Sequence, residues 1–205
     1  MPKPPRSKYK SNLHHRRSIR LKGYDYSQKG LYFITLCCQD RKHFFGAINN
    51  GNMILNKAGA IVKDEWKKTP SIRQNTALHE YIIMPNHFHA IIEILFSKNS
   101  PALGESGFAP TDFRSPSQTI GAIIRGFKGA STKRIKEYYF SEDISSSTGE
   151  LQFAPTEFAP TDKIWQRNYY EIIIRNEQTH NRITEYIKNN PALWEKDRFH
   201  IPKNQ

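Results

Sequence analysis

The stretch Tyr81-Ile-Ile-Met-Pro-Asn-His-Phe-His-Ala-Ile-Ile-Glu-Ile94 decides the fold, because it sets two histidines in an apolar run typical of a buried strand. Side chains alternate between the two faces of a strand, so His87 and His89 project from one face and Phe88 from the other. Two imidazoles held side by side can chelate one divalent metal ion. The same spacing also suits two hydrogen-bonded polar residues at the edge of a core, and the motif alone leaves both interpretations open.

The segments before this strand carry strand, hairpin and helix patterns in turn. Residues 31–38 form a dense apolar and β-branched run, which predicts a buried strand. Asn49-Asn50-Gly51 predicts a hairpin turn between residues 43–48 and 52–55. Asn56 can cap a helix over residues 57–69, in which Glu65 is the one polar residue on the apolar stripe.

The remaining elements continue this alternation. The pattern predicts a strand over 77–84, a bend at 84–86, the histidine strand to residue 96, a helix over 117–139, a strand over 169–174, and a helix that Asn176 caps and that ends before Pro191.

The composition favours a basic protein with a polyanionic partner. The chain has 205 residues, 37% of them hydrophobic, with a net charge of +12. Nucleic acid is the commonest partner of such a chain, and an anionic membrane surface is the weaker alternative because no amphipathic anchor is evident. No apolar run approaches the ~20 residues that a membrane span requires. The adjacent Cys37 and Cys38 point to opposite faces of a strand, which argues against a disulfide and fits a reducing cytoplasm.

Three segments have low-complexity or strongly biased sequences. Residues 1–22 carry eight Lys and Arg and no acidic residue, which predicts a flexible basic arm. Residues 97–116 and 141–162 read as loops, and they share the repeated motif Phe-Ala-Pro-Thr, which begins at Phe108, Phe153 and Phe158. We interpret these copies as insertions at tolerant loops, with short peptide-binding motifs as the alternative.

The helix predicted over 117–139 has a basic face. Arg125, Lys128 and Lys133 lie broadly opposite its apolar stripe. They are candidate phosphate contacts, as is the basic arm. An ordinary solvated helix face explains the same pattern.

The last predicted helix supplies further polar groups. Tyr186 and Asn190 are four residues apart and lie on the same stripe as Ile183 and Ile187. If this stripe packs on the histidine face, the site holds two imidazoles, an amide and a phenol. Otherwise Tyr186 is a core aromatic residue and Asn190 caps the helix before proline.

Three motifs in this order carry a resemblance to a known family. They are Met84-Pro-Asn-His-Phe-His, Trp165-Gln-Arg-Asn-Tyr-Tyr and Tyr186-Ile-Lys-Asn-Asn-Pro191. Residues 20–195 resemble the IS200-like Y1 transposases of the HUH superfamily, and more closely the REP-associated tyrosine transposases. The resemblance implies a domain over 23–195 and a tail over 196–205. It also implies an α+β fold, ferredoxin-like or RRM-like, with a central antiparallel β-sheet flanked by helices.

The resemblance also implies an activity. His87 and His89 match the metal ligands, Asn190 matches the position of a further ligand, and Tyr186 matches the nucleophile. The expected reaction is cleavage and rejoining of single-stranded or hairpin DNA, such as repetitive palindromic elements, through a 5′-phosphotyrosine with Mg²⁺ or Mn²⁺. We expect a cytoplasmic monomer or homodimer with no membrane partner.

The sequence leaves three alternatives open. Tyr169 and Tyr170 are rival nucleophiles by residue type, although they precede the last strand. A non-catalytic nucleic-acid-binding module on an RRM-like sheet would explain the charge and the aromatic residues equally well. A rolling-circle replication initiator shares the chemistry, but the short chain carries no helicase segment.

Overall fold

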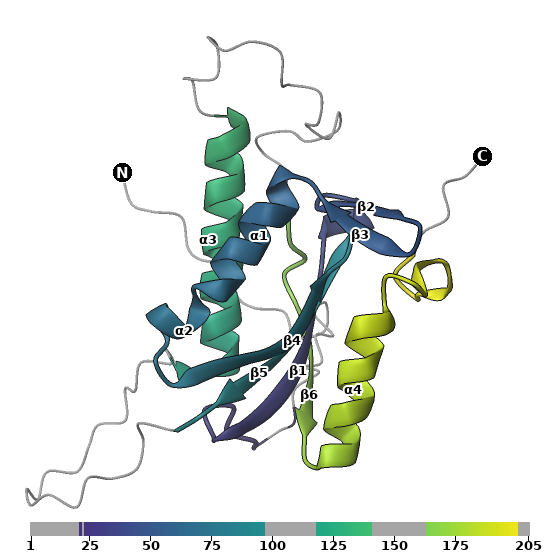
Figure 1. Cartoon of the computed structure of the whole chain (residues 1–205). Coiled ribbons are helices and arrows are strands. Elements are labelled where there is room, and N and C mark those ends of the chain that lie inside the picture. The colour runs from purple at the N-terminus through teal and green to yellow at the C-terminus, as the bar shows by residue number, and fades with distance from the viewer. Residues whose placement is uncertain (1–20, 22, 97–117, 141–162, 201–205) are drawn as a thin grey trace, which may run out of the picture.

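The computed structural model describes residues 21, 23–96, 118–140 and 163–200, and its centre is a four-stranded sheet (Figure 1). The strands and helices are β1 (Gly30–Cys37), β2 (Gly46–Asn49), β3 (Asn52–Leu55), α1 (Lys57–Lys67), α2 (Thr69–Ile72), β4 (Thr76–Ile83), β5 (His87–Ile94), α3 (Ile120–Phe140), β6 (Tyr170–Ile174) and α4 (Glu177–Asn189). Short 3-10 helices, η2 (Gln39–Arg41) and η6 (Trp194–Lys196), complete the described elements.

The sheet has the order β4-β5-β1-β6, and every neighbouring pair is antiparallel. If the separate β2–β3 hairpin and the one-turn helix α2 are set aside, the chain runs β1, α1, β4, β5, α3, β6. This is the β-α-β-β-α-β arrangement of ferredoxin-like folds. The predicted α+β fold class with a central antiparallel sheet is therefore confirmed.

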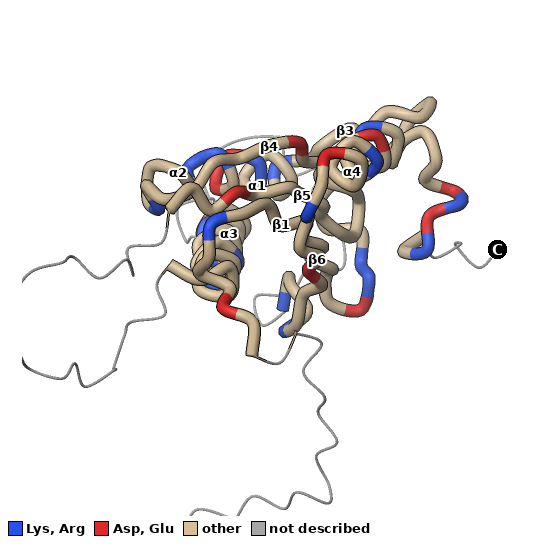
Figure 2. The backbone as a smooth tube through the Cα atoms, turned by 90° about the horizontal axis from the view of Figure 1, so that it is seen from below, with Lys and Arg blue, Asp and Glu red and all other residues tan. Residues whose placement is uncertain are grey.

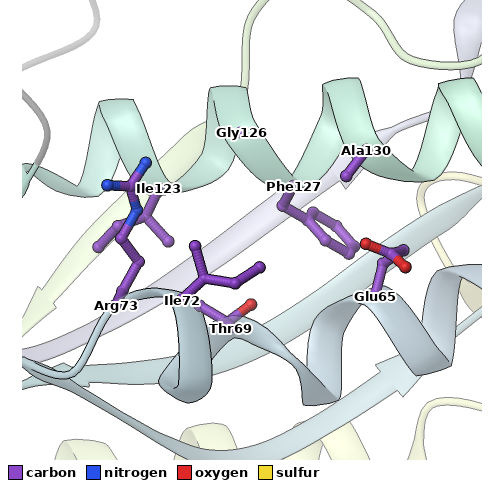
Figure 3. Close-up of a pocket in the computed structure, with 8 residues that line it drawn as sticks. All are labelled: Glu65, Thr69, Ile72, Arg73, Ile123, Gly126, Phe127 and Ala130. Carbon is purple, nitrogen blue, oxygen red and sulfur yellow. The ribbon is translucent and has the colours of Figure 1, made fainter.

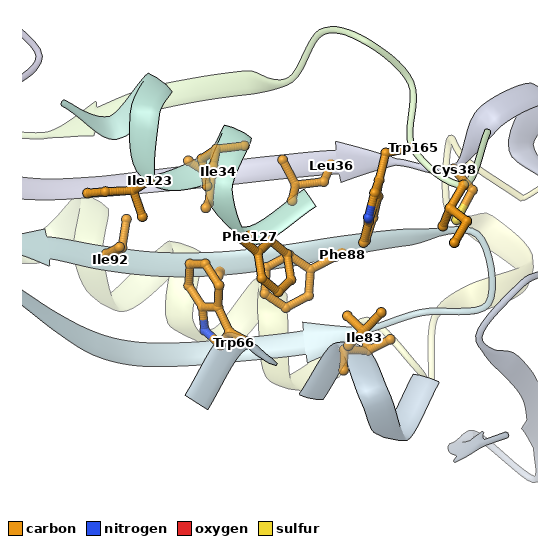
Figure 4. Packing of buried hydrophobic residues seen from close by; sticks show 14 of the residues in the cluster. Ile34, Leu36, Cys38, Trp66, Ile83, Phe88, Ile92, Ile123, Phe127 and Trp165 are labelled. Atoms are coloured by element: carbon orange, nitrogen blue, oxygen red, sulfur yellow. The ribbon is translucent and has the colours of Figure 1, made fainter. Parts of the chain in front are cut away.

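Helices cover both faces of the sheet. α1 and α3 lie on one face and α4 lies on the other (Figure 1). Alternation along β1 supports this division, because Ile34 and Leu36 belong to the larger core cluster while Phe33 packs with Ile183 and Ile187 of α4. In the larger core, Trp66 of α1 and Phe127 of α3 meet Phe88 of β5 (Figure 4).

The predicted caps are present at two helix starts. The side chain of Asn56 accepts a hydrogen bond from the Gly59 amide at 2.9 Å, and that of Asn176 accepts one from the Thr179 amide at 2.8 Å. The end of the first helix differs from the prediction. α1 ends at Lys67, and Pro70 lies in the first turn of α2, where its missing N–H is tolerated.

Glu65, the polar residue on the apolar stripe of α1, is buried rather than exposed. Its Oε1 accepts hydrogen bonds from Lys68 at 2.9 Å and from Arg134 of α3 at 2.6 Å. Burial acts to raise the pKa of this carboxyl, but the two cations outweigh burial and hold the pKa below its ordinary value. The acid therefore joins α1 to α3 as a charged contact.

Candidate active site

The two histidines project from the sheet face that α4 covers. In the register of the sheet His87 lies opposite Cys37 and His89 lies opposite Thr35. Both imidazoles are 0% exposed. Their Nδ1 atoms are held by hydrogen bonds, His87 to Asn86 Oδ1 at 2.9 Å and His89 to Thr35 Oγ1 at 2.8 Å. These bonds orient both Nε2 atoms away from the strand, as neighbouring polar groups do for metal-binding histidines.

α4 brings the predicted tyrosine and asparagine to these rings. The Tyr186 hydroxyl lies 3.1 Å from His89 Nε2. Among the described residues, His87 Nε2 and Asn190 Oδ1 are buried atoms with no hydrogen-bond partner. Buried polar atoms normally find partners, so an unpaired ring nitrogen and an unpaired amide oxygen in one site point to a missing ligand. The structure therefore brings together the four residues predicted for catalysis and metal binding, and these roles stay predictions.

Asp197 is a site residue that the sequence prediction missed. Its Oδ2 accepts a hydrogen bond from Asn190 Nδ2 at 2.9 Å and one from the Tyr186 hydroxyl at 3.4 Å. Ligand atoms of His87, His89 and Asp197 all lie within 4.8 Å of one another. The hydrogen bond to Asp197 fixes the orientation of the Asn190 amide. Its Nδ2 faces Asp197, and its Oδ1 has no partner among the described residues.

The sequence prediction ended the domain at residue 195 and placed Asp197 in a tail, and this boundary stays a prediction, although residues 194–200 contact the site. Phe199 is buried, and its ring lies 4.7 Å from that of His87 and 5.9 Å from that of His89. Trp194 stacks on His87 from the same segment at 5.9 Å. The large aromatic Phe199 was the available signal, because solvated tails rarely carry such residues. Residues 201–205 lie outside the described part of the chain.

Burial shapes the protonation of the site. It lowers the pKa of His87 to about 4 and that of His89 well below its ordinary value. Burial first, and then the Asp197 carboxylate, raises the pKa of Tyr186 to about 12. At neutral pH the imidazoles are therefore neutral, as metal ligands must be, and the phenol keeps its proton.

The three predicted DNA-binding residues do not join this site. Arg125, Lys128 and Lys133 lie on α3, which packs on the opposite face of the sheet. Lys128 donates hydrogen bonds to the carbonyls of Gln166 and Asn168, both at 2.9 Å, so its ammonium is engaged within the fold. Figure 2 shows Lys and Arg on both sides of the sheet rather than gathered at one place. Arg125 and Lys133 are exposed and stay candidate phosphate contacts away from the histidines.

The two rival tyrosines lie on different faces of the sheet. Tyr169 packs against the larger core beside Lys128, on the face away from the histidines. Tyr170 lies opposite Thr35 in the sheet, two strands away from His89, and its side chain is 52% exposed. Of the three tyrosines, Tyr186 is the one whose hydroxyl lies at hydrogen-bonding distance from a predicted metal ligand in the described structure, which favours it over both rivals.

A small pocket of about 100 Å³ lies on the other side of the sheet (Figure 3). It opens between α1, α2 and α3, and its walls include Glu65, Arg73 and Phe127. The sheet separates this pocket from the histidines, so it takes no part in the chemistry of the site.

Comparison with known proteins places the chain in a family. A protein of Haemophilus influenzae, described as an uncharacterized protein, is 40% identical over 199 residues, which are 95% of this chain and 98% of that protein. The chain belongs to the family of this protein. No family model matches the chain.

Among solved structures, the fold is similar to that of a REP-associated tyrosine transposase bound to a REP hairpin. The match has a TM-score of 0.50 and 16% sequence identity, and it covers 85% of this chain and 73% of that one. At this identity the likeness establishes the fold, which is the one implied by the sequence motifs. Within the described segments, no helix is long and apolar enough to cross a membrane.

Proposed function

We propose that the protein is a metal-dependent endonuclease and strand transferase that cleaves single-stranded or hairpin DNA through a 5′-phosphotyrosine on Tyr186. One observation carries the proposal: the Tyr186 hydroxyl lies 3.1 Å from His89 Nε2, beside the unpartnered His87 Nε2 and Asn190 Oδ1. A tyrosine positioned against a group of unpaired ligand atoms has the arrangement of an oxygen nucleophile at a metal site.

His87, His89 and Asn190 would hold the metal ion, with Asp197 close enough to join them. The donor set fits a divalent cation, because it offers neutral ring nitrogens, an amide oxygen and a carboxylate. Mg²⁺ prefers oxygen ligands, so the histidine pair favours Mn²⁺. Such an ion, when bound, stabilises the negative charge that develops on a phosphate under attack.

Tyr186 supplies the nucleophile. Its Oη forms a bond to the phosphorus, the bond from phosphorus to the 3′ oxygen breaks, and that oxygen leaves as a 3′-hydroxyl after taking a proton. With a pKa of about 12 the phenol must pass its own proton to a base, and Asp197 Oδ2, which accepts a hydrogen bond from this hydroxyl at 3.4 Å, is positioned to take it. The phosphotyrosine keeps the energy of the broken bond, so a 3′-hydroxyl of another strand can reverse the step without ATP.

The segment that carries Asp197 also controls access to the site. His87 and His89 are fully buried and Asn190 is 2% exposed, with Phe199 and Trp194 packed over the His87 ring. A phosphate therefore reaches these ligands only if residues 194–200 shift. Tyr186, 39% exposed, is the member of the site that DNA can meet first.

The test is a search for a covalent protein–DNA adduct. Wild-type protein incubated with labelled single-stranded hairpin DNA and Mn²⁺ should give an adduct that survives denaturing electrophoresis. Tyr186→Phe should give none, because it removes only the attacking oxygen, and should bind DNA within a few-fold of wild type. Tyr170→Phe is the matched control and should retain the adduct. An adduct that persists in Tyr186→Phe would overturn the assignment, and none in wild type would favour a non-catalytic binding module.

A further inference from the structure

One strip of the sheet beside the site is left uncovered by the residues that the structure describes. On β6, Tyr170 and Ile172 are each 52% exposed, although β6 is otherwise a half-buried strand. β6 forms the edge of the described sheet, next to β1. An exposed aromatic and an exposed isoleucine two residues apart share one face of a strand and form a continuous patch.

The register of the sheet fixes which face carries this patch. Tyr170 lies opposite Thr35, and Thr35 lies opposite His89. Ile172 lies opposite Phe33, whose ring stacks on His89 at 5.3 Å and meets Tyr186 edge-on at 6.2 Å. Directly opposite residues point to the same face, so Tyr170 and Ile172 extend the face that holds the histidines. Two strand spacings separate Tyr170 from His89, about 10 Å.

The charges around the patch suit a polyanion. Arg167 and Arg175, one before and one after β6, are exposed. Glu171 lies between Tyr170 and Ile172 in sequence, and alternation directs it to the opposite face, where Ile34 is its partner in the register. The patch thus combines an aromatic ring and an apolar side chain without an acid of β6 on the same face, and an exposed arginine lies three residues along the chain from the patch on either side.

We infer that Tyr170 and Ile172 form a platform on which a base of single-stranded DNA stacks while the adjoining phosphate lies at Tyr186. Aromatic side chains beside basic groups are the usual means of holding single strands without reading sequence. The inference rests on the proposed function for the position of the phosphate, but the platform itself predicts binding that needs neither metal nor cleavage. It also gives Tyr170 a role other than that of nucleophile.

Binding in the presence of a chelator tests the platform. The probe is a fluorescein-labelled single-stranded 12-mer of mixed sequence, compared by anisotropy with the same sequence as a duplex. Tyr170→Ala should raise the Kd for the single strand about tenfold, a typical loss for one stacked base, and leave the duplex Kd within about twofold. Tyr170→Phe keeps the ring and should bind like wild type. Tyr170→Leu keeps the apolar bulk without the ring and should show the weakened binding of Tyr170→Ala.

Tyr138→Ala is the matched control, because Tyr138 is 44% exposed on α3, on the far side of the sheet. It should bind the single strand like wild type. Unchanged single-strand binding by Tyr170→Ala, or an equal loss for single strand and duplex, overturns the platform. The platform is also overturned if sedimentation shows a concentration-dependent dimer that Tyr170→Ala dissociates without changing DNA binding. In that case the patch contacts a second copy of the chain.

The outcomes separate the platform from the nuclease. A Tyr186-dependent adduct together with normal binding by Tyr170→Ala overturns the platform and leaves the proposed function standing. If Tyr170→Ala weakens DNA binding but the wild type forms no adduct, the platform is supported and the proposed nuclease activity is ruled out.

Discussion

At the scale of single residues, some buried polar atoms of the site have hydrogen-bond partners among the described residues and others have none. Each histidine has its Nδ1 bonded within the protein, while His87 Nε2 and Asn190 Oδ1 have no partner among the described residues. An arrangement that served only to pack the core would leave these buried atoms at an energetic cost of about 1–3 kcal/mol each. A metal ion would satisfy both.

The contrast between ring-nitrogen and amide-oxygen ligands predicts how strongly each substitution at a metal-binding position affects cleavage. His87→Ala and His89→Ala should each stop cleavage, because each removes a nitrogen ligand that no neighbour replaces. Asn190→Ala should be milder and should raise the metal concentration needed for half-maximal cleavage, because water can occupy the position of a neutral amide oxygen. Mn²⁺ should rescue Asn190→Ala better than Mg²⁺ does, since it tolerates imidazole ligands.

Calorimetric titration with Mn²⁺ checks the same assignment without relying on cleavage. Wild type should show one site, which weakens in Asn190→Ala and disappears in His87→Ala. If wild type binds no metal ion with or without single-stranded DNA, the metal-dependent mechanism is wrong.

At the scale of elements, α3 is held to its neighbours by two charged side chains. Arg134 pairs with Glu65 of α1, and Lys128 bonds to the carbonyls of Gln166 and Asn168 before β6. Both contacts join segments far apart in the sequence. The hydrogen bonds of Lys128 therefore give this residue of the predicted basic face a role in the fold rather than in ligand binding.

A pair of substitutions on α3 tests this division. Lys128→Met should lower the free energy of unfolding by about 1–2 kcal/mol, because two carbonyls lose their donor. Lys133→Ala should change it by less than about 0.5 kcal/mol, since the 3.6 Å ion pair of Lys133 with Glu137 is exposed. Urea unfolding measures both. An equal effect of the two substitutions would contradict the structural role of Lys128.

Lys128 also predicts a pH dependence. Burial lowers its pKa to about 8, below the ordinary 10.5. Below pH 8 Lys128 is protonated in both the folded and the unfolded chain, and the full free-energy cost of burying its charge is present. Between about pH 8 and 10.5 the unfolded chain binds more protons, so this group's contribution to stability rises with pH. A neutral amine still offers donors to the two carbonyls, so the stability of wild type relative to Lys128→Met should increase over this range.

At the scale of the whole molecule, much of the net positive charge comes from one segment at the N-terminal end of the sequence. Residues 1–20 contain seven Lys and Arg of a chain with net charge +12, and they lie outside the described residues. The candidate platform and α3 carry a few exposed cations each. Non-specific attraction of DNA is therefore expected to depend strongly on the arm.

Deleting residues 1–20 should weaken DNA binding and flatten its salt dependence. If all seven cations contact phosphates of a single strand, the slope of log K against log salt concentration falls by up to about 5. Anisotropy titrations at several salt concentrations measure it. Equal slopes for the full chain and the truncated chain would show that the arm makes no phosphate contact.

The sequence by itself determined which residues share a face within each element. Strand alternation placed His87 and His89 together and helical spacing placed Tyr186 beside Asn190. The antiparallel sheet was implied by the resemblance of the sequence motifs to a known family. The relations within each element depend on local geometry, which a short stretch of sequence specifies. For the same reason the caps at Asn56 and Asn176 were predictable.

Only the tertiary structure decided which of these faces meet. The path of the chain puts α4 over the histidines and α3 on the opposite side of the sheet, which separates Arg125 and Lys133 from the site and engages Lys128 within the fold. It also returns Asp197 and Phe199 to the rings of His87 and His89, more than 100 residues away in sequence. No local period encodes such contacts, because they arise from packing between elements rather than from the conformation of any one of them.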